Sequence, residues 1–519
     1  MILTRREWQL VLLGGVLLSL ALPPLPTGPL AWIGLVPLLM AIEDATPRRA
    51  ALIGYVFGVI QHLGSLYWIG FHVDMPRWLA ILAWLLAPFI LGLYTMGTTW
   101  SLRVASRWAG QSWAWMLPFA WTGFEYLRYF TEFSFPWVIL GHTQARLLGL
   151  IQQADIWGVL GVSFWVATLN VIAYRALLTA PASRRGAWNY AAAFVFVVAA
   201  TALYGRFRLG ETATKPQNIR IAIVQPNISM DTKWRGGNGI QASADTLLRQ
   251  TARIEPGSVD LVIWPETAIP DYIMYTPPGR EPDERIVNPR YRRLMAVVTE
   301  HTGAPLVSGV PANDYTENKQ YNSSMLVMPE SLAVQSYDKR LLVPFGERVP
   351  YQRVFGFLGE LNLGIARWSA GTRLTVFQTP VARFGLGICF ESVFPHLMRQ
   401  FVRSGADFLV VVTNDAWFGR TSLIYQHAAF ASFRAIENRV WIARGANTGI
   451  SAIIDPWGRM VQSAGVFEQE TLIGTVGKRE RDTLYLLWGD WIGQVSLVAT
   501  LALVIGGWRA GRGRRRRRG

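Results

Sequence analysis

The sequence predicts an α-helical membrane protein with eight transmembrane helices and an inserted extracytoplasmic α/β domain. The chain has 519 residues, of which 51% are hydrophobic and 16% are charged, whereas soluble chains carry about 25% charged residues. It also holds 23 tryptophans, a residue type enriched where helices cross the membrane–water interface. A long polar stretch between apolar runs indicates that a folded domain lies outside the bilayer.

The apolar runs define the expected transmembrane helices. A helix that spans the hydrocarbon core needs about 20 residues. The expected spans are residues 8–25, 28–42, 50–70, 78–100, 110–128, 152–178, 187–204 and 485–507. We therefore divide the chain into a seven-helix membrane domain (1–204), an extracytoplasmic domain (205–484), an eighth helix (485–507) and an Arg-rich tail (508–519).

The distribution of arginine between the loops predicts the orientation. With a cytoplasmic N-terminus, the cytoplasmic segments hold Arg5, Arg6, Arg48, Arg49, Arg103, Arg107, Arg175, Arg184, Arg185 and the tail. The opposite loops hold Arg77, Arg128 and Arg146. Because Lys and Arg accumulate on the cytoplasmic side, both termini are expected in the cytoplasm and residues 205–484 in the periplasm.

The net charge of +16 does not indicate a nucleic-acid partner. Seven arginines lie in the last eleven residues, directly after an apolar run. Such a tail sets topology and contacts anionic lipid, and no base-reading motif accompanies it. We expect the bilayer, not nucleic acid, to be its partner.

The polar domain alternates between β-rich and helical segments. The expected strands are Ile219–Gln225, Val259–Trp264, Pro305–Val310, Ser323–Met328, Leu374–Gln378, Gly385–Phe390 and Phe408–Thr413, and the expected helices are 241–254, 289–302, 395–404 and 424–438. Strands interleaved with helices of this length predict a layered α/β domain.

Three short segments each place a reactive residue near the end of a probable strand: Glu266 after Trp264-Pro265, Lys339 after Tyr337-Asp338, and Cys389 in the apolar run Gly385–Phe390. Taken singly, each has a plainer interpretation. Glu266 could neighbour a helix cap, Lys339 could belong to a solvated Lys–Arg pair, and a lone cysteine is usually a small buried apolar residue. Together they predict acyl-transfer chemistry, because a carboxylate can deprotonate a thiol and an ammonium can stabilise an oxyanion.

These motifs resemble the carbon–nitrogen hydrolase (nitrilase) superfamily. The later segments Thr413–Gly419 and Arg434–Arg439 fit the same resemblance. It implies a four-layer αββα sandwich and a catalytic triad of Glu266, Lys339 and Cys389. With seven spans before the domain and one after it, the whole chain resembles the apolipoprotein N-acyltransferase family, whose members are membrane-embedded proteins of that superfamily.

The resemblance implies further site residues. The expected supporting or substrate-binding residues are Glu347, Phe390, Glu391, Trp417 and Trp234. Phe390 stands where the family often has tyrosine, so no hydroxyl role carries over. Trp234 matches a tryptophan of a mobile loop at the entrance, although an ordinary packed aromatic is an equal alternative. Residues Phe135–Trp137, with Gly141, match a membrane-side stretch.

The implied activity is N-acylation of the N-terminal diacylglyceryl-cysteine of apolipoproteins in the bacterial inner membrane. A phospholipid would donate the acyl chain, and the reaction would pass through a thioester on Cys389. A membrane-tethered amidase or nitrilase acting on a soluble substrate is the alternative enzyme. A transporter is the alternative from another class, but it would place ionisable residues inside the spans, and Glu125 and Asp155 are among the few found there.

No cofactor and no metal are expected, because the histidines lack metal-binding spacing and no phosphate-binding glycine loop follows a strand. The apolar, glycine-punctuated residues 351–368 are expected to form a lipid-facing lid. Buried core cover is the alternative for that segment.

Overall fold

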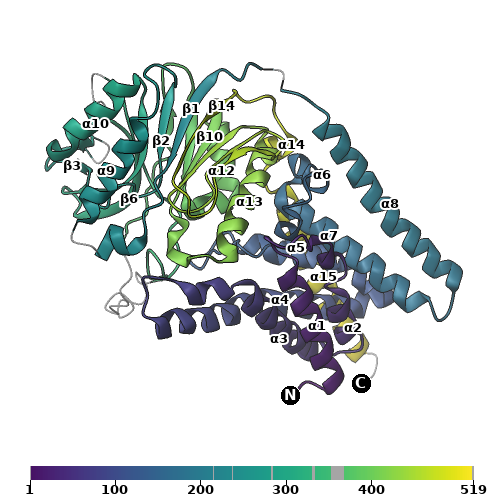
Figure 1. Cartoon of the computed structure of the whole chain (residues 1–519). Coiled ribbons are helices and arrows are strands. Elements are labelled where there is room, and N and C mark those ends of the chain that lie inside the picture. Colours follow the sequence, from purple (N-terminus) through teal and green to yellow (C-terminus); the bar gives the residue numbers. More distant parts are fainter. Residues whose placement is uncertain are drawn as a thin grey trace. The chain divides into compact units, whose positions relative to one another are not determined.

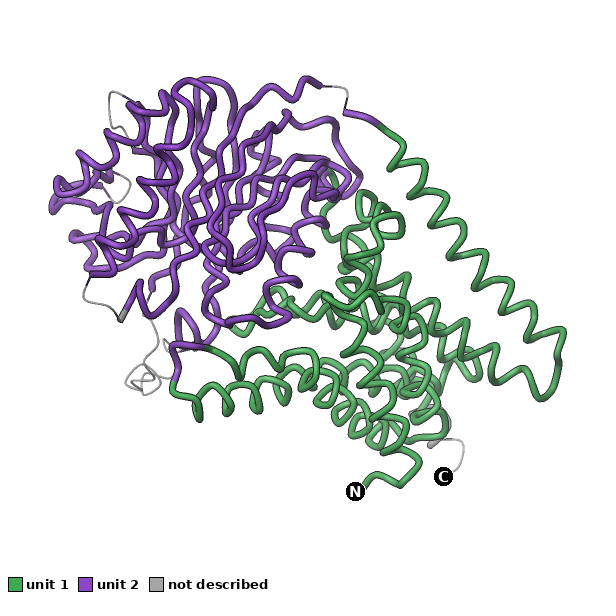
Figure 2. Tube along the Cα trace, in the orientation of Figure 1, with its two compact units in different colours: residues 1–72, 76–211, 487–519 green, residues 73–75, 212–486 purple. Residues whose placement is uncertain are grey.

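The computed structural model describes residues 2–213, 215–235, 238–281, 284–329, 334–351 and 368–516. Residues 352–367 of the expected lid therefore lie outside the described residues. The chain forms two compact units (Figure 2). The helical unit comprises residues 1–72, 76–211 and 487–519, and the α/β unit comprises residues 73–75 and 212–486.

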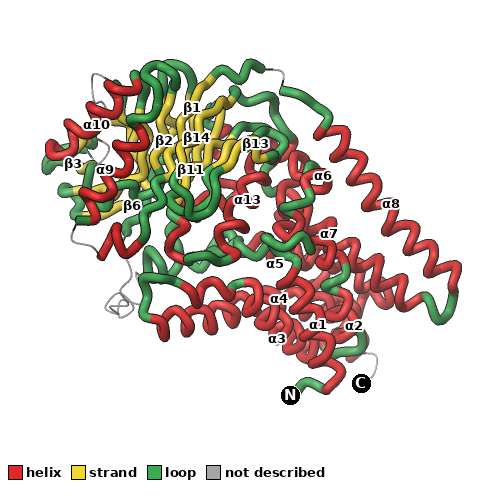
Figure 3. The backbone as a smooth tube through the Cα atoms, viewed as in Figure 1, coloured by secondary structure: helices red, strands yellow, loops and turns green. Residues whose placement is uncertain are grey.

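The helical unit is built from helices alone (red in Figure 3). In chain order they are α1 (Arg5–Leu20), η1 (Gly28–Trp32), α2 (Val36–Ile42), α3 (Pro47–Ser65), η2 (Tyr67–Phe71), α4 (Arg77–Ala109), η3 (Gly110–Met116), α5 (Leu117–Leu127), η4 (Leu140–Gln144), α6 (Leu148–Ile151), α7 (Ala154–Thr179), α8 (Arg184–Leu209) and α15 (Trp491–Arg516).

Every apolar run expected to span the membrane overlaps one or more of these helices. Among the described residues, four helical segments are long and apolar enough to cross a membrane: Arg77–Leu127, Ala154–Thr179, Arg184–Leu209 and Trp491–Gly511. The first has 51 residues, which is enough for two crossings at about 20 residues each. The chain is thus a membrane protein by composition and helix length, while the count of eight spans stays a prediction.

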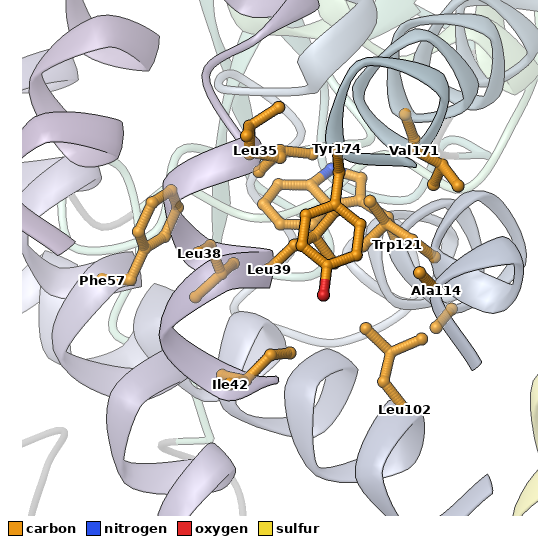
Figure 4. Packing of buried hydrophobic residues seen from close by; sticks show 14 of the residues in the cluster. Leu35, Leu38, Leu39, Ile42, Phe57, Leu102, Ala114, Trp121, Val171 and Tyr174 are labelled. Carbon is orange, nitrogen blue, oxygen red and sulfur yellow. The ribbon is translucent and has the colours of Figure 1, made fainter. Parts of the chain in front are cut away.

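Buried aliphatic and aromatic side chains hold the helices of this unit together (Figure 4). Leu35, Leu39 and Phe57 are fully buried in this cluster, and Trp121 and Tyr174 are nearly so. Small residues let α3 and α4 approach each other closely. A Cβ atom on Gly54 would lie 2.0 Å from Thr99 Oγ1 and 2.8 Å from the carbonyl oxygen of Thr95. Packing between membrane helices relies on such close contacts, since lipid supplies no hydrophobic driving force between them.

The ionisable residues of α5 bind the neighbouring backbone. Glu125 Oε1 accepts from the backbone N–H of Leu140 at 2.7 Å, and Arg128 donates to the carbonyl oxygens of Val138 at 2.7 Å and Phe135 at 2.9 Å. The two side chains thereby hold the irregular segment that contains Phe135–Trp137. These contacts give Glu125 and Arg128 a structural role in this unit.

The α/β unit contains two sheets flanked by helices. Its elements are β1 (Ile219–Gln225), η5 (Asp231–Arg235), α9 (Gly239–Thr251), β2 (Leu261–Trp264), β3 (Met274–Thr276), β4 (Ile286–Val287), α10 (Pro289–Thr302), β5 (Leu306–Asp314), β6 (Lys319–Val327), β7 (Val334–Asp338), β8 (Val376–Gln378), β9 (Arg383–Ile388), η6 (Cys389–Val393), α12 (Pro395–Arg403), β10 (Phe408–Thr413), η7 (Asp415–Phe418), α13 (Ser422–Asn438), β11 (Ile442–Ala446), β12 (Ala452–Ile454), β13 (Met460–Ser463), β14 (Glu470–Val476) and α14 (Leu484–Trp488), which lies at the unit boundary.

The two sheets pack face to face. The first has eight strands: six follow the order β14-β1-β2-β5-β3-β4, β6 also pairs with β5, and β7 pairs with β6. The second has six strands in the order β13-β12-β11-β10-β9-β8. Helices α9 and α10 pack on the first sheet, and α12 and α13 pack on the second (Figure 1). The αββα sandwich implied by the resemblance is therefore confirmed.

Local sequence explains where these elements begin and end. In α10, the Asn288 side chain accepts from Arg290 N, Pro289 occupies the first turn, and Gly303 ends the helix with φ of 67°. Asparagine caps, N-terminal proline and left-handed glycine are the usual helix boundaries. Parallel strands such as β10, with the sequence Phe-Leu-Val-Val-Val-Thr, are buried on both faces, as an apolar, β-branched run predicts.

The structure corrects one strand boundary that matters for function. The predicted strand Gly385–Phe390 was too long, because β9 ends at Ile388 and Cys389 begins the short helix η6. Strands β3, β4, β7 and β11–β14 were not predicted. Most are short or amphipathic, and their pairing depends on partners distant in the sequence.

The close approach of α3 and α4 yields a stability prediction. Gly54→Ala should lower the thermal midpoint of the protein in detergent, because the added methyl overlaps Thr99 and overpacking costs about 1–3 kcal/mol. Gly149→Ala is the matched control, since a Cβ there meets nothing within 4 Å. Equal midpoints for the two variants would show that the helices separate without cost.

Candidate active site

Glu266 lies two residues beyond the end of β2, where Pro265 stops the strand. Its side chain is 4% exposed, and both carboxylate oxygens accept hydrogen bonds. Oε1 accepts from Asn322 Nδ2 at 2.8 Å and Oε2 accepts from the backbone N–H of Asn414 at 2.8 Å. The backbone of β5 approaches closely, since a Cβ on Gly309 would lie 2.5 Å from Glu266 Cα. The carboxylate is thus fixed in place.

Lys339 follows β7 and is 1% exposed. Its Nζ donates to Glu347 Oε1 at 2.8 Å and lies 3.7 Å from Glu266 Oε1. Burial alone would lower the pKa of Lys339, but Glu347, Glu266 and Cys389 together raise it above the usual value. The ammonium therefore stays charged among these groups, as an oxyanion-stabilising cation must.

Asn322, on β6, joins the two carboxylates and was not predicted from the sequence. Its Nδ2 donates to Glu266 Oε1 at 2.8 Å and to Glu347 Oε1 at 2.9 Å, while its backbone oxygen accepts from Lys339 N at 2.9 Å. An asparagine inside an antiparallel strand carries no signal of this role. The pairing of β6 with β7 alone brings it beside Lys339.

Cys389 follows β9 with φ of 52°, a left-handed conformation that is uncommon for a non-glycine residue. Its side chain is partly exposed. Burial of the sulfur and the negative charge of Glu266 raise the pKa of the Cys389 thiol, while Lys339 opposes them. The thiol therefore needs a base to become a nucleophile. Lys339 Nζ lies 3.7 Å from Glu266 Oε1, and both charges act on the Cys389 thiol, so the three predicted residues lie close together.

Glu391 is fully buried and ties the cysteine turn to the lysine segment. Oε2 accepts from Ile388 N at 2.8 Å. Oε1 accepts from the Tyr337 hydroxyl at 2.8 Å, and from the backbone N–H groups of Arg340 at 2.7 Å and Leu341 at 3.2 Å. Burial raises the pKa of Glu391, although these donors oppose the shift.

The remaining predicted residues occupy different positions. Glu347 holds Lys339, and its Oε2 accepts from Val343 N at 2.9 Å. Phe390 is buried and packs edge-on against Phe394 at 5.0 Å between ring centroids. The carbonyl oxygen of Trp417 accepts from Val73 N at 2.8 Å, so a short stretch between η2 and α4 belongs to the α/β unit. Trp234, in η5, is 39% exposed.

Lys233 precedes Trp234 and is a second buried cation that the sequence did not indicate. It is 2% exposed, and its Nζ donates to the backbone oxygen of Glu266 at 3.5 Å. Burial lowers the pKa of Lys233 to about 7, while Glu266 opposes the shift. From the sequence, a lysine next to an exposed tryptophan would be expected at the surface. Only the fold shows that Lys233 is buried beside Glu266.

Three groups of the type that bind metals meet beside the sulfur. Cys389 Sγ, an Asp415 oxygen and a His427 ring nitrogen lie within 4.8 Å of one another. The Asp415 carboxylate already accepts from Arg444 at 2.8 Å and from Thr413 Oγ1 at 3.0 Å, and contacts His427 Nδ1 at 2.8 Å. The groups thus form a hydrogen-bonded network, not an open set of ligands. His427 is not among the site residues expected from the sequence.

Comparison with known proteins supports the same interpretation. The Carbon-nitrogen hydrolase family model matches residues 220–483, and the Apolipoprotein N-acyltransferase N-terminal domain model matches residues 14–172. An apolipoprotein N-acyltransferase of Geobacter metallireducens is 35% identical over 96% of this chain and 95% of its own length. The chain belongs to the apolipoprotein N-acyltransferase family.

A second relative in this family also aligns over nearly its full length. The apolipoprotein N-acyltransferase of Chlorobaculum tepidum is 34% identical and covers 97% of each chain. A solved structure, Saccharomyces cerevisiae Nit3 of the nitrilase superfamily, is 20% identical, covers 54% of this chain and 96% of its own, and aligns with a TM-score of 0.37.

Lys233 gives a pH-dependent stability prediction. Its pKa of about 7 in the folded chain lies below the value of about 10.4 for a free lysine. Unfolding therefore takes up a proton between these values, and the stability of the wild type should rise with pH from about 7 to 10. Below pH 7 both states are charged and the full cost of burial remains.

Lys233→Met should flatten this rise in thermal midpoint, while Lys478→Met, which replaces an exposed lysine, should retain it. Each pKa unit corresponds to about 1.4 kcal/mol. A wild-type midpoint that does not change over this pH range would contradict the prediction.

Proposed function

We propose that this chain transfers an acyl chain from a membrane phospholipid to the N-terminal amine of diacylglyceryl-cysteine in apolipoproteins. The observation that carries the proposal is the convergence of Glu266, Lys339 and Cys389 in one α/β unit of a chain rich in membrane helices. The names of the full-length relatives support the substrate class.

The first half-reaction acylates the enzyme. Glu266 takes the thiol proton of Cys389, and the thiolate attacks an ester carbonyl carbon of the phospholipid. Lys339, with a backbone N–H near Phe390, holds the negative charge that develops on the carbonyl oxygen. The ester C–O bond breaks, Glu266 returns its proton to the departing glyceryl oxygen, and a lysophospholipid leaves. A thioester remains on Cys389.

The second half-reaction releases the sulfur. The neutral α-amine of the lipoprotein cysteine attacks the thioester carbonyl, a C–N bond forms and the C–S bond breaks. Glu266 takes the proton from nitrogen and returns it to the Cys389 thiolate. Passing through a thioester divides one difficult acyl transfer into two easier steps.

The proposed topology matches lipid substrates. Seven spans precede the α/β unit and one follows it, with both termini in the cytoplasm and the α/β unit in the periplasm. The arginine distribution between the loops supports this orientation. Moving an acyl chain through water would cost about 0.8 kcal/mol for each exposed CH₂ group, so a membrane-anchored catalyst avoids that cost.

The alternative function is a membrane-tethered amidase or nitrilase that passes the acyl group to water. It would use the same three residues, so the products must decide. Release of lysophospholipid together with an amide-linked acyl chain on a lipoprotein peptide supports the transferase, whereas hydrolysis of a soluble amide without lysophospholipid supports the alternative.

The nucleophile is tested by intact mass. Incubation of the wild type with phospholipid should add one acyl chain to the protein, and Cys389→Ala and Cys389→Ser should abolish both the adduct and turnover. A serine hydroxyl has a much higher pKa than a thiol and is poorly matched to a carboxylate base. Acyl transfer by the Cys389→Ala variant would rule out the thioester.

Glu266 and Lys339 are tested by the rate of acyl-enzyme formation. Glu266→Gln keeps the shape but removes the base, so the adduct should not form. Lys339→Ala should slow its formation by about 10²–10³, the usual loss for one oxyanion donor. Normal adduct formation in either variant would reject the role assigned to that residue.

A further inference from the structure

A buried network runs from β11 to the turn that holds Cys389. Asp415 accepts from Arg444 NH2 at 2.8 Å through Oδ2 and from Thr413 Oγ1 at 3.0 Å through Oδ1. Burial opposes ionisation of this carboxyl, but the guanidinium of Arg444 is a fixed positive charge at 2.8 Å that favours the carboxylate and lowers the pKa of Asp415. The ionised carboxylate can only accept, so His427 Nδ1, at 2.8 Å from Oδ1, must donate its proton to it.

The other ring nitrogen faces two oxygens. His427 Nε2 lies 2.9 Å from Ser392 Oγ and 3.1 Å from the carbonyl oxygen of Cys389, and Ser392 Oγ donates to that same carbonyl at 2.8 Å. If His427 were neutral, Nε2 would carry a lone pair and the Ser392 proton would have to serve three close contacts. The Ser392 proton can point at only one acceptor. In each of the other contacts, two lone pairs would then face each other with no hydrogen between them.

A proton on Nε2 removes this conflict. Nε2–H then donates to Ser392 Oγ and toward the Cys389 carbonyl, while the Ser392 hydroxyl donates to the carbonyl. We infer that His427 is an imidazolium, a positioning residue that fixes the carbonyl of Cys389 and places a positive charge beside its sulfur. This inference rests on the proposed role of Cys389 as nucleophile.

The imidazolium acts on the turn in two ways. It holds the carbonyl of a residue whose φ of 52° is unfavourable without such support. One of its ring nitrogens lies within 4.8 Å of Sγ, so its charge favours the thiolate, whereas burial, Glu266 and Asp415 disfavour it. The groups facing His427 are Asp415 on η7, Cys389 and Ser392 on η6, and, through Asp415, Arg444 on β11. Lys339, which follows β7, is the second cation beside the sulfur. Lys339 and the His427 imidazolium would therefore both stabilise the Cys389 thiolate.

Alkylation of the thiol tests the inference without lipid or lipoprotein. Cys389 is the single cysteine of the chain, so iodoacetamide reports on it alone in the full-length protein in detergent. At an effective dielectric constant of about 20, one charge at this distance changes an equilibrium constant by well over tenfold. His427→Gln should therefore react about tenfold to a hundredfold more slowly at pH 7, and should recover the wild-type rate at high pH.

Two variants serve as controls. His396→Gln makes the same substitution on α12, where burial lowers the pKa of the histidine to about 4, so no charge is lost and the profile should stay unchanged. Ser392→Ala keeps the imidazolium and should change the rate at pH 7 by less than about threefold. A shift as large as that of His427→Gln would overturn the charge assignment.

The remaining outcomes are equally decisive. If the midpoint of the alkylation rate against pH is unchanged in His427→Gln, His427 carries no charge and the inference is wrong. If alkylation is lost at every pH, His427 is purely structural and the inference is also wrong. A wild type that alkylates as expected but makes no acyl-enzyme would instead refute the proposed function. If the variant does not fold, solid-state NMR of wild type with ¹⁵N-labelled histidine decides: one of the six rings should remain doubly protonated at pH 8.5.

Discussion

The active-site geometry depends on the hydrogen bonds of one buried carboxylate, Glu391. This side chain accepts from Ile388 at the end of β9 and from Tyr337, Arg340 and Leu341 around the end of β7. Strand β9 belongs to one sheet and β7 to the other. Glu391 therefore links the two sheets at the point where the cysteine and the lysine leave them. A buried carboxylate with four donors is well satisfied, and losing it would leave several backbone N–H groups unpaired at a cost of about 1–3 kcal/mol each.

The site holds two carboxylates, Glu266 and Glu347, beside the ammonium of Lys339. Neutral hydrogen-bond donors stabilise these carboxylates. Glu266 and Glu347 share Asn322, and Glu266 takes a second donor from the backbone of Asn414. These neutral donors stabilise two carboxylates beside one ammonium, Lys339, without neutralising the base. The thiol remains protonated at rest because burial and Glu266 raise its pKa. In the proposed mechanism, the thiol becomes a nucleophile when Glu266 accepts its proton.

Sequence reasoning selected Glu266, Lys339 and Cys389 as the proposed catalytic residues because each follows a strand within a short, recognisable motif. It also located Glu347 and Glu391, which lie close to those motifs. It missed Asn322 and Lys233, whose roles come from pairing between distant segments. Asn322 lies in an ordinary antiparallel strand, and Lys233 reaches Glu266 only through the fold of η5. The same limit applies to the sheets, where long apolar strands such as β1 and β10 were predicted and short ones that depend on their partners were not.

Some strained backbone positions lie at or beside the proposed site residues. Among the described non-glycine residues with positive φ are Cys389 itself, Thr267, which follows Glu266, and Phe345, which precedes Glu347 by two residues. Such conformations cost of order 1–3 kcal/mol each and persist only where the surroundings enforce them. At Cys389 the enforcing groups are Glu391 on one side of the turn and Ser392 with His427 on the other. At Glu266, Gly309 N donates to the Pro265 carbonyl and Ala268 N donates to the Gly309 carbonyl. A regular strand would direct alternate side chains into the two faces of the sheet. The strained turns instead turn the carboxylate and the thiol out of their strands, and the hydrogen bonds that stabilise those turns therefore also hold the reacting groups in place.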